Sequence, residues 1–397
     1  MPRSSQRLTR ALRAAALLAV AAAAPLASHA QTIQTSCGNA ILLDADTRSV
    51  LFEKEADTLE SPASTAKIMT AELVFRQIAA GKLSLDDTFD VSEHAWRTGG
   101  ASSGGSAMFA PLRSKIRVED LIRGLVVQSG NDAAITLAEG VAGTEEAFAR
   151  MMTDRARELG LRKSSFVNAW GKGDPQQKVT AREMAMLADH VIHAYPNFYR
   201  YFGEREFTWN KIRQMNRNPL LFMDIGADGL KTGNIAESGF GLVGSAVQNG
   251  QRLIVVLNNC RTAKDRAEEG RKLILWGFRS FDRRALFAAG EVVGAAKVYG
   301  GAAREVPLVA DGPVTLFQPR GATEKLTGAI VYEGPVPAPV EKGQKIATLK
   351  ITRGQASVLD VPLRAAEAVP AGSLPRRALD AGLEFGSSLV RRYVLRK

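Results

Sequence analysis

A serine and a lysine that could act as nucleophile and base stand three residues apart, at Ser64 and Lys67. On a helix this spacing places both side chains on one face. A serine hydroxyl attacks a carbonyl carbon only when a base takes its proton, and a lysine is such a base only if burial or a second cation lowers its pKa. The alternative is a serine that caps a helix, followed by an exposed lysine.

Two more short motifs, each present once, follow this pair along the chain. S-G-N supplies Ser129 and Asn131, and K-T-G supplies Lys231 and Thr232. The serine–lysine pair alone arises easily by chance. Three motifs in this order favour a catalytic site over a coincidence.

The segments before and around the first motif have the patterns needed to position it. Residues 40–44 and 49–52 predict two strands joined by a polar turn. The spacing of apolar residues after Ser64 predicts a helix that ends at Gly81. This helix should be buried and should present its first turn to a cleft.

The second motif is predicted to lie in a turn between two helices. The first of these helices covers residues 118–127, after which Gly130 breaks it and Asn131 or Asp132 caps the next one. Residues 98–106 are rich in Gly and Ser, and we expect a mobile loop beside the cleft there.

The third motif is predicted to lie in an antiparallel sheet. Residues 229–233, 239–247 and 253–258 predict three strands, with a hairpin at the Asn249-Gly250 pair. The G-x-G-x-x-G pattern in the second strand leads to a hairpin and not to a helix, so it does not predict a dinucleotide site. A lysine on such a strand could line a cleft where an extended peptide binds.

The chain has four histidines, and they form no recognisable catalytic group. His190 and His193 share one face of a predicted helix over residues 181–193, but no third metal ligand accompanies them. A solvated helix face is the favoured interpretation. We therefore expect neither a metal site nor a Ser-His-Asp mechanism.

Composition divides the chain into four parts. Residues 1–30 contain arginines, an apolar run and a small-x-small site, which predicts a secretory signal peptide and export. Residues 31–281 hold the three motifs, and residues 282–372 predict a small all-β domain. Residues 373–397 combine an apolar face with positive charge, so this segment could lie on an anionic membrane or pack on its own domain. The net charge of +11 does not decide between lipid and wall polymer, and no nucleic-acid partner is expected.

The three motifs, in the contexts P-A-S-x-x-K-I-M-T, V-Q-S-G-N-D-A and D-G-L-K-T-G, resemble those of the D-alanyl-D-alanine carboxypeptidases, the low-molecular-mass penicillin-binding proteins. The resemblance implies an α/β fold, with a transpeptidase/β-lactamase-like domain whose antiparallel sheet is flanked by helices, then a small all-β domain and an amphipathic C-terminal helix. It implies removal of the terminal D-alanine from peptidoglycan stem pentapeptides through an acyl-enzyme that β-lactam antibiotics trap. It also implies a periplasmic enzyme at the inner-membrane surface that needs no cofactor.

The same resemblance implies a role for each motif residue. Ser64 would be the acylated nucleophile, Lys67 its general base, and Ser129 a proton shuttle to the leaving D-alanine. Asn131 would hold the acyl peptide, and Lys231 would keep the site positive.

The resemblance also assigns the groups that hold the ends of the substrate. Thr232 and Arg266 would bind its terminal carboxylate, a task suited to a fixed cationic fork. The backbone N–H groups of Ser64 and Asn234 would form the oxyanion hole.

The fold implied by the resemblance places the first strand beside the last strand of the sheet. It thereby implies a disulfide between Cys37 and Cys260. Two features depart from the family: Asn234 replaces the common His after K-T-G, and N-A-W-G-K-G at residues 168–173 replaces the usual His-Gly-Leu or Thr-Gly-Leu. We expect the first change to tune the rate and the second to affect substrate preference.

Three competing functions remain. A β-lactamase of class A would need an E-x-x-L-N motif, which the chain lacks. An endopeptidase that cuts peptide crosslinks stays open, since the motifs do not separate it from a carboxypeptidase. A non-catalytic wall-binding protein is disfavoured by the intact motif residues.

Overall fold

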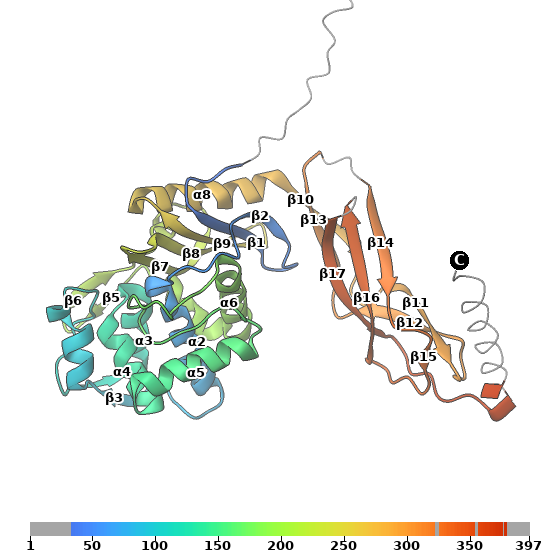
Figure 1. The fold of residues 1–397 in the computed structure, drawn as a ribbon, viewed down its shortest axis with the longest axis horizontal. Coiled ribbons are helices and arrows are strands. Elements are labelled where there is room, and N and C mark those ends of the chain that lie inside the picture. Colours follow the sequence, from blue (N-terminus) through green and yellow to red (C-terminus); the bar gives the residue numbers. More distant parts are fainter. Residues whose placement is uncertain (1–32, 322–324, 354–355, 376, 379–397) are drawn as a thin grey trace, which may run out of the picture. The chain divides into compact units, whose positions relative to one another are not determined.

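The helices and strands of the computed structural model form two groups, the first ending at Ser280 and the second beginning at Phe281 (Figure 1). The expected signal peptide and nearly all of the expected amphipathic segment lie outside the described residues. No helix in the described part of the chain has both the length and the apolar character to cross a membrane. The structure describes residues 33–321, 325–353, 356–375 and 377–378.

A five-stranded antiparallel sheet is the centre of the first group, in the order β2-β1-β9-β8-β7. Its strands occur where the sequence predicts them, and Asn249 and Gly250 form the hairpin with φ angles of 51° and 76°. The strands are β1 (Asn39–Asp44), β2 (Val50–Lys54), β7 (Ala227–Ile235), β8 (Gly239–Gln248) and β9 (Gln251–Cys260).

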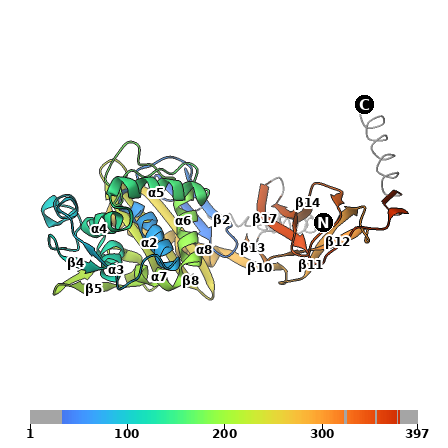
Figure 2. The same ribbon diagram turned by 90° about the horizontal axis from the view of Figure 1, so that it is seen from below.

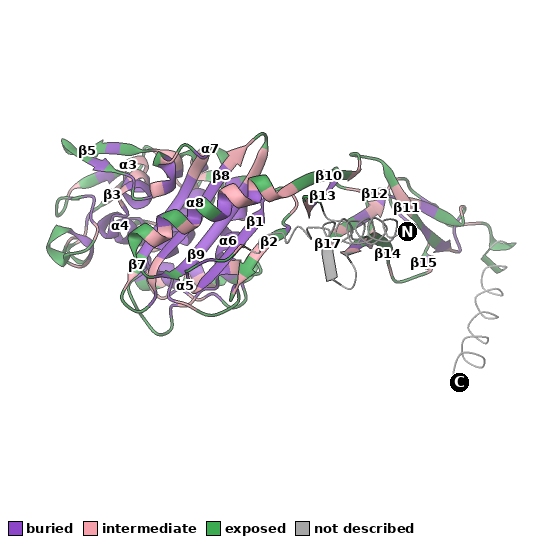
Figure 3. Ribbon diagram, turned by 90° about the horizontal axis from the view of Figure 1, so that it is seen from above, coloured by how far each residue is buried: buried purple, intermediate pink, exposed green. Residues whose placement is uncertain are grey.

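Each face of this sheet is covered by helix, because alternate residues of its strands point to opposite sides. On one face the side chains of Leu42 and Leu253 lie against α8 (Ala263–Ser280). Figure 3 shows α8 crossing the buried strands. On the other face Ile41 and Leu43 join the larger core, to which the remaining helices contribute.

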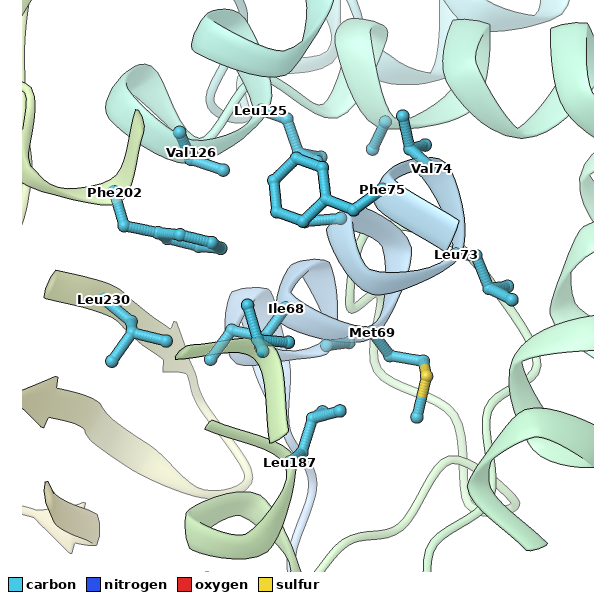
Figure 4. Close-up of a cluster of buried hydrophobic side chains, with 14 of the residues drawn as sticks. Ile68, Met69, Leu73, Val74, Phe75, Leu125, Val126, Leu187, Phe202 and Leu230 are labelled. Carbon is cyan, nitrogen blue, oxygen red and sulfur yellow. The ribbon is translucent and has the colours of Figure 1, made fainter. Parts of the chain in front are cut away.

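The helix α2 (Lys67–Ala79) lies in the middle of that core, among α4, α5 and α6 (Figure 2). Its residues from Lys67 to Phe75 are all buried, and Figure 4 shows Phe75 between Leu125 and Phe202. A helix that is buried on every side is held by packing all round. The other helices are α3 (Val118–Arg123), α4 (Asn131–Ala142), α5 (Glu145–Glu158), α6 (Ala181–Ala194) and α7 (Pro196–Tyr199).

Short turns and hairpins complete the first group. The pairs β3–β4 and β5–β6 are small antiparallel hairpins or ribbons outside the main sheet. The short helical turns include the π-type η2, which leads into η3, and the π-type η4, which leads into the S-G-N motif. The elements are η1 (Ala63–Ala66), β3 (Thr88–Asp90), η2 (Ala95–Gly99), η3 (Ala101–Ser103), β4 (Lys115–Arg117), η4 (Gly124–Gln128), η5 (Arg200–Gly203), β5 (Glu206–Trp209), β6 (Ile212–Met215) and η6 (Pro219–Phe222).

Three expectations differ from the structure. The segment 98–106 is partly helical, since η2 and η3 occupy its first half. No side chain caps α4: Asn131 accepts from the Lys67 amine, and Asp132 accepts from the backbone N–H groups of Met108, Ala110 and its neighbour Ala133. The solvated helix face is wrong for His190, whose ring Nε2 lies 3.1 Å from Oε1 of the fully buried Glu72.

The second group is all β, as the composition predicts, and has an apolar core of its own. A six-stranded sheet has the order β14-β16-β17-β12-β11-β15, and β10 pairs with β13. The strands are β10 (Phe281–Phe287), β11 (Val292–Tyr299), β12 (Glu305–Ala310), β13 (Val314–Pro319), β14 (Leu326–Val331), β15 (Val336–Pro337), β16 (Lys345–Arg353) and β17 (Ala356–Ala365).

Candidate active site

The candidate nucleophile Ser64 lies in the 3₁₀ turn η1, directly before α2. Ala63 has a left-handed φ of 46°, a conformation that costs energy for a residue with a Cβ and needs support from its surroundings. Part of that support comes from Ser238, whose hydroxyl donates to the Ser61 carbonyl at 3.0 Å. The half-buried hydroxyl of Ser64 is therefore presented from a fixed turn.

The amine of Lys67 has three hydrogen-bond partners. Its Nζ lies 3.1 Å from Oγ of Ser64, 2.8 Å from Oδ1 of Asn131 and 2.6 Å from the carbonyl oxygen of Trp170. The last two are oxygens that only accept, so they take two N–H groups. A neutral amine has two such hydrogens and one lone pair, so in the neutral form the lone pair would face the serine hydroxyl.

The surroundings of Lys67 favour this neutral form. Complete burial lowers the pKa of Lys67 well below its ordinary value, and the positive charge of Lys231 lowers it further. The carboxylates of Asp132 and Glu145 act in the opposite direction but do not outweigh these causes. An uncharged lysine in contact with a serine can take the hydroxyl proton.

The S-G-N motif joins η4 to α4 by a sharp turn. Ser129 is buried with a left-handed φ of 68°, and Asn131 is the first residue of α4. Asp132 accepts hydrogen bonds from the backbone N–H groups of Met108 at 2.9 Å and Ala110 at 3.0 Å. Its carboxylate thus ties the loop before residue 111 to this turn, which fixes the serine and the asparagine at the cleft.

Lys231 lies on β7 and is buried, with its Nζ donating to the Thr232 carbonyl at 3.2 Å. Burial lowers the pKa of Lys231 to about 7, assisted by the nearby charges of Arg217 and Arg266. Gly233 lets this strand approach the nucleophile, since a Cβ there would lie 3.0 Å from the Pro62 carbonyl oxygen. The K-T-G strand is therefore packed directly against η1.

Two arginines add positive charge to the cleft. Arg266, in the first turns of α8, lies over the ring of Phe240 and donates to the Gly233 carbonyl at 3.4 Å. Arg217 was missed by sequence reasoning, because a single arginine in a loop carries no signal. Burial lowers the pKa of each guanidinium without removing its charge.

The loop that departs from the family closes over Lys67. Gly171 has a φ of 90°, and a Cβ on it would lie 1.8 Å from the carbonyl oxygen of Ala63. Only glycine allows this approach, which brings the Trp170 carbonyl to the lysine amine. Asn168 closes the loop by accepting from the N–H groups of Gly171 and Lys172 at 2.8 and 2.9 Å.

These segments enclose a cleft of about 810 Å³. Its lining contains the cationic side chains of Lys172, Arg217 and Arg266 and no carboxylate. The cleft therefore suits a substrate with an anionic end. All eight expected catalytic and substrate-binding residues meet here, with Lys67 and Lys231 immediately behind the lining. The expected residues that line it are Ser64, Ser129, Asn131, Thr232, Asn234 and Arg266.

The two cysteines lie at the ends of adjacent strands. Cys37 precedes β1 and Cys260 ends β9, and their sulfurs form a disulfide with a Cα–Cα separation of 4.1 Å. Among the described residues, no group of three or more His, Cys, Asp or Glu side chains could hold a metal ion.

Known proteins share both groups of elements. Residues 25–262 match the family described as D-alanyl-D-alanine carboxypeptidase, and residues 281–371 match the family described as penicillin-binding protein 5, C-terminal domain. The carboxypeptidase DacC of Escherichia coli K12 is 38% identical over 343 residues, 86% of each chain. DacA of Haemophilus influenzae is 35% identical and covers 77% of this chain and 78% of its own.

Solved structures agree with these matches. Penicillin-binding protein 5 from Haemophilus influenzae superposes with a TM-score of 0.77 at 32% identity, covering 85% of this chain and 98% of its own. Penicillin-binding protein D2 from Listeria monocytogenes, in its cefotaxime-bound form, has a TM-score of 0.57 at 28% identity and covers 62% of this chain and 98% of its own. The chain belongs to the D-alanyl-D-alanine carboxypeptidase family.

Proposed function

We propose that this chain is a serine-type D-Ala-D-Ala carboxypeptidase that removes the terminal D-alanine from peptidoglycan stem pentapeptides. The observation that carries the proposal is the amine of Lys67, buried between two acceptor oxygens and 3.1 Å from Oγ of Ser64. The relatives named above are D-alanyl-D-alanine carboxypeptidases, which supports the same reaction.

In the acylation step, Nζ of Lys67 takes the proton from Oγ of Ser64, and Oγ bonds to the carbonyl carbon of the penultimate D-alanine. The backbone N–H groups of Ser64 and Asn234 receive the negative charge that develops on the carbonyl oxygen. As the peptide bond breaks, the proton passes through Ser129 to the amine of the leaving D-alanine. Water then attacks the acyl-enzyme and releases the shortened peptide.

The charge of the cleft supports a substrate that ends in a carboxylate. Arg217, Thr232 and Arg266 line the cleft, the buried Lys231 precedes Thr232 on β7, and the lining holds no acid. We assign the terminal carboxylate to Thr232 and Arg266. A β-lactam has a comparable carboxylate and a reactive carbonyl, so the same contacts would lead it to acylate Ser64.

We further propose that the enzyme works outside the inner membrane, in the periplasm. The pattern typical of a signal peptide at residues 1–30 and the disulfide between Cys37 and Cys260 support an oxidising compartment. The basic, amphipathic pattern of residues 373–397 supports peripheral attachment to an anionic membrane.

The test is release of free D-alanine from a stem pentapeptide by the mature protein, with a crosslinked peptide dimer offered in parallel. We expect release from the pentapeptide and none from Ser64→Ala. A matched control is Ser84→Ala, an exposed serine that does not line the cleft. Cleavage of the dimer with the pentapeptide untouched would move the assignment to endopeptidase, and activity in Ser64→Ala would overturn the mechanism.

A further inference from the structure

Glu145 is a buried acid that the mechanism above does not use. It is the first residue of α5, follows the capping residue Thr144, and is only 8% exposed. The start of a helix favours a carboxylate, but burial still disfavours a charge that lacks partners. Its two oxygens do have partners, and these lie on different elements.

One oxygen of Glu145 holds the loop that covers the catalytic lysine. Oε1 accepts the backbone N–H of Ala169 at 2.9 Å. The carbonyl of the same residue accepts from the hydroxyl of Thr70 at 2.5 Å. The N–H and the carbonyl of Ala169 are therefore both held, the first by α5 and the second by α2. The next residue is Trp170, whose carbonyl receives the Lys67 amine.

The other oxygen of Glu145 is held by a histidine. Oε2 lies 3.0 Å from Nε2 of His94, whose side chain is about half exposed. The second ring nitrogen of His94 lies 3.3 Å from the hydroxyl of Thr98. The carboxylate is thus oriented from the side opposite Ala169, and it cannot turn away without losing this contact.

We propose that Glu145 is a positioning residue for the catalytic lysine: it holds Ala169 so that the Trp170 carbonyl keeps the Lys67 lone pair aimed at Ser64, and His94 orients Glu145. The inference rests on the proposed function of the cleft. Small displacements of reacting groups, about 1 Å, lower rates by up to about a hundredfold. The bond from Ala169 to Glu145 is the charge-assisted one among the hydrogen bonds that hold this loop, and its loss opens the loop to such a displacement.

The test measures the rate of acylation by a fluorescent penicillin, together with the melting temperature, in the full-length mature protein. Glu145→Ala removes the acceptor, and we expect acylation to fall about tenfold or more. Glu145→Gln keeps an oxygen for Ala169 and an N–H for neutral His94, so the maximal rate should stay within about threefold of wild type. The acylation rate of His94→Ala should lie between the rates of these two variants. Glu146→Ala, an exposed neighbour on the same helix, is the matched control and should be unchanged.

The pH profile separates the charge of Glu145 from the hydrogen bond that it accepts. The charges that act on Lys67 are Lys231 and Arg217, which lower its pKa, and Asp132 and Glu145, which raise it. Removing the carboxylate in Glu145→Gln lowers the pKa of Lys67, so the acidic limb of the acylation profile should shift to lower pH.

The outcomes distinguish failure of the inference about Glu145 from failure of the proposed function. Acylation of folded Glu145→Ala at the wild-type rate would overturn the inference and leave the proposed function intact. A loss that appears equally in Glu145→Gln and tracks a fall in melting temperature would also overturn it, in favour of a purely structural role. Failure of the wild-type protein to react with penicillin would overturn the proposed function itself, and the inference with it.

Discussion

The region around α2 and the region after Phe281 each have an apolar core, but they differ in what else they bury. The first buries charged groups almost completely, including Lys67, Asp132 and Lys231. In the described part of the second region, Thr315 has the sole buried polar side chain. Buried charge disfavours folding unless it is paired, so the first region contains groups that serve chemistry at a cost in stability.

Backbone conformation follows the same division. Ala63, beside the nucleophile, and Ser129, at the second motif, both have left-handed φ angles. Among the described residues after Phe281, every residue with such an angle is a glycine. Non-glycine residues persist in this conformation only when the surrounding contacts enforce it, and such residues gather at functional sites. In the β region each residue type thus has a φ angle that it prefers, whereas the cleft contains non-glycine residues with disfavoured φ angles.

Replacing the catalytic lysine should give the largest change. We expect Lys67→Met to lower the rate of acylation by about 10²–10⁴-fold, because the general base is lost. The melting temperature should rise or stay level, since methionine fills a similar space without a buried amine. Acylation by labelled penicillin and calorimetry measure the two effects.

The control for this change is Lys82→Met, an exposed lysine just after the end of α2. It should leave the acylation rate and the melting temperature unchanged. A Lys67→Met protein that still acylates at a tenth of the wild-type rate or faster would contradict the assignment of the base.

Much of this site could be predicted from the sequence. Apolar periodicity gave the position of α2 and the strand that carries Lys231, and three short motifs gave the polar groups. Arg217 and Glu145 could not be found, because each is a single charged residue whose role depends on a segment distant in sequence. The contact from Lys67 to the Trp170 carbonyl could not be predicted either, because every residue type has the same backbone carbonyl.

The second prediction concerns Lys231 and the pH dependence of stability. Its pKa in the folded protein is about 7, below the value of about 10.4 in an unfolded chain. Between these values the unfolded state binds more protons, so the wild-type free energy of unfolding should rise with pH. Below about pH 7 the full penalty of burying the charge is present.

Lys231→Met should therefore be more stable than wild type at pH 7, by an amount of the order of a few kcal/mol. The difference should shrink as the pH approaches 10, where Lys231 becomes neutral in the unfolded chain as well as in the folded protein. Denaturant unfolding at pH 6, 8 and 10 measures it. A difference that stays constant with pH, or a less stable variant throughout, would show that the lysine charge is compensated in the folded protein.

The smallest effect on catalysis is expected from the β region. Leu363 on β17 and Leu73 on α2 are both buried, so Leu363→Ala and Leu73→Ala remove the same side-chain atoms from the two cores. Each should lower the stability of its own region by about 2–5 kcal/mol. Only Leu73 shares a helix with Lys67, so we expect slower acylation in Leu73→Ala and a rate within about twofold of wild type in Leu363→Ala. Equal losses of acylation in the two variants would mean that the catalytic cleft depends on the β core as directly as on its own, and the contrast between the regions would then be one of composition alone.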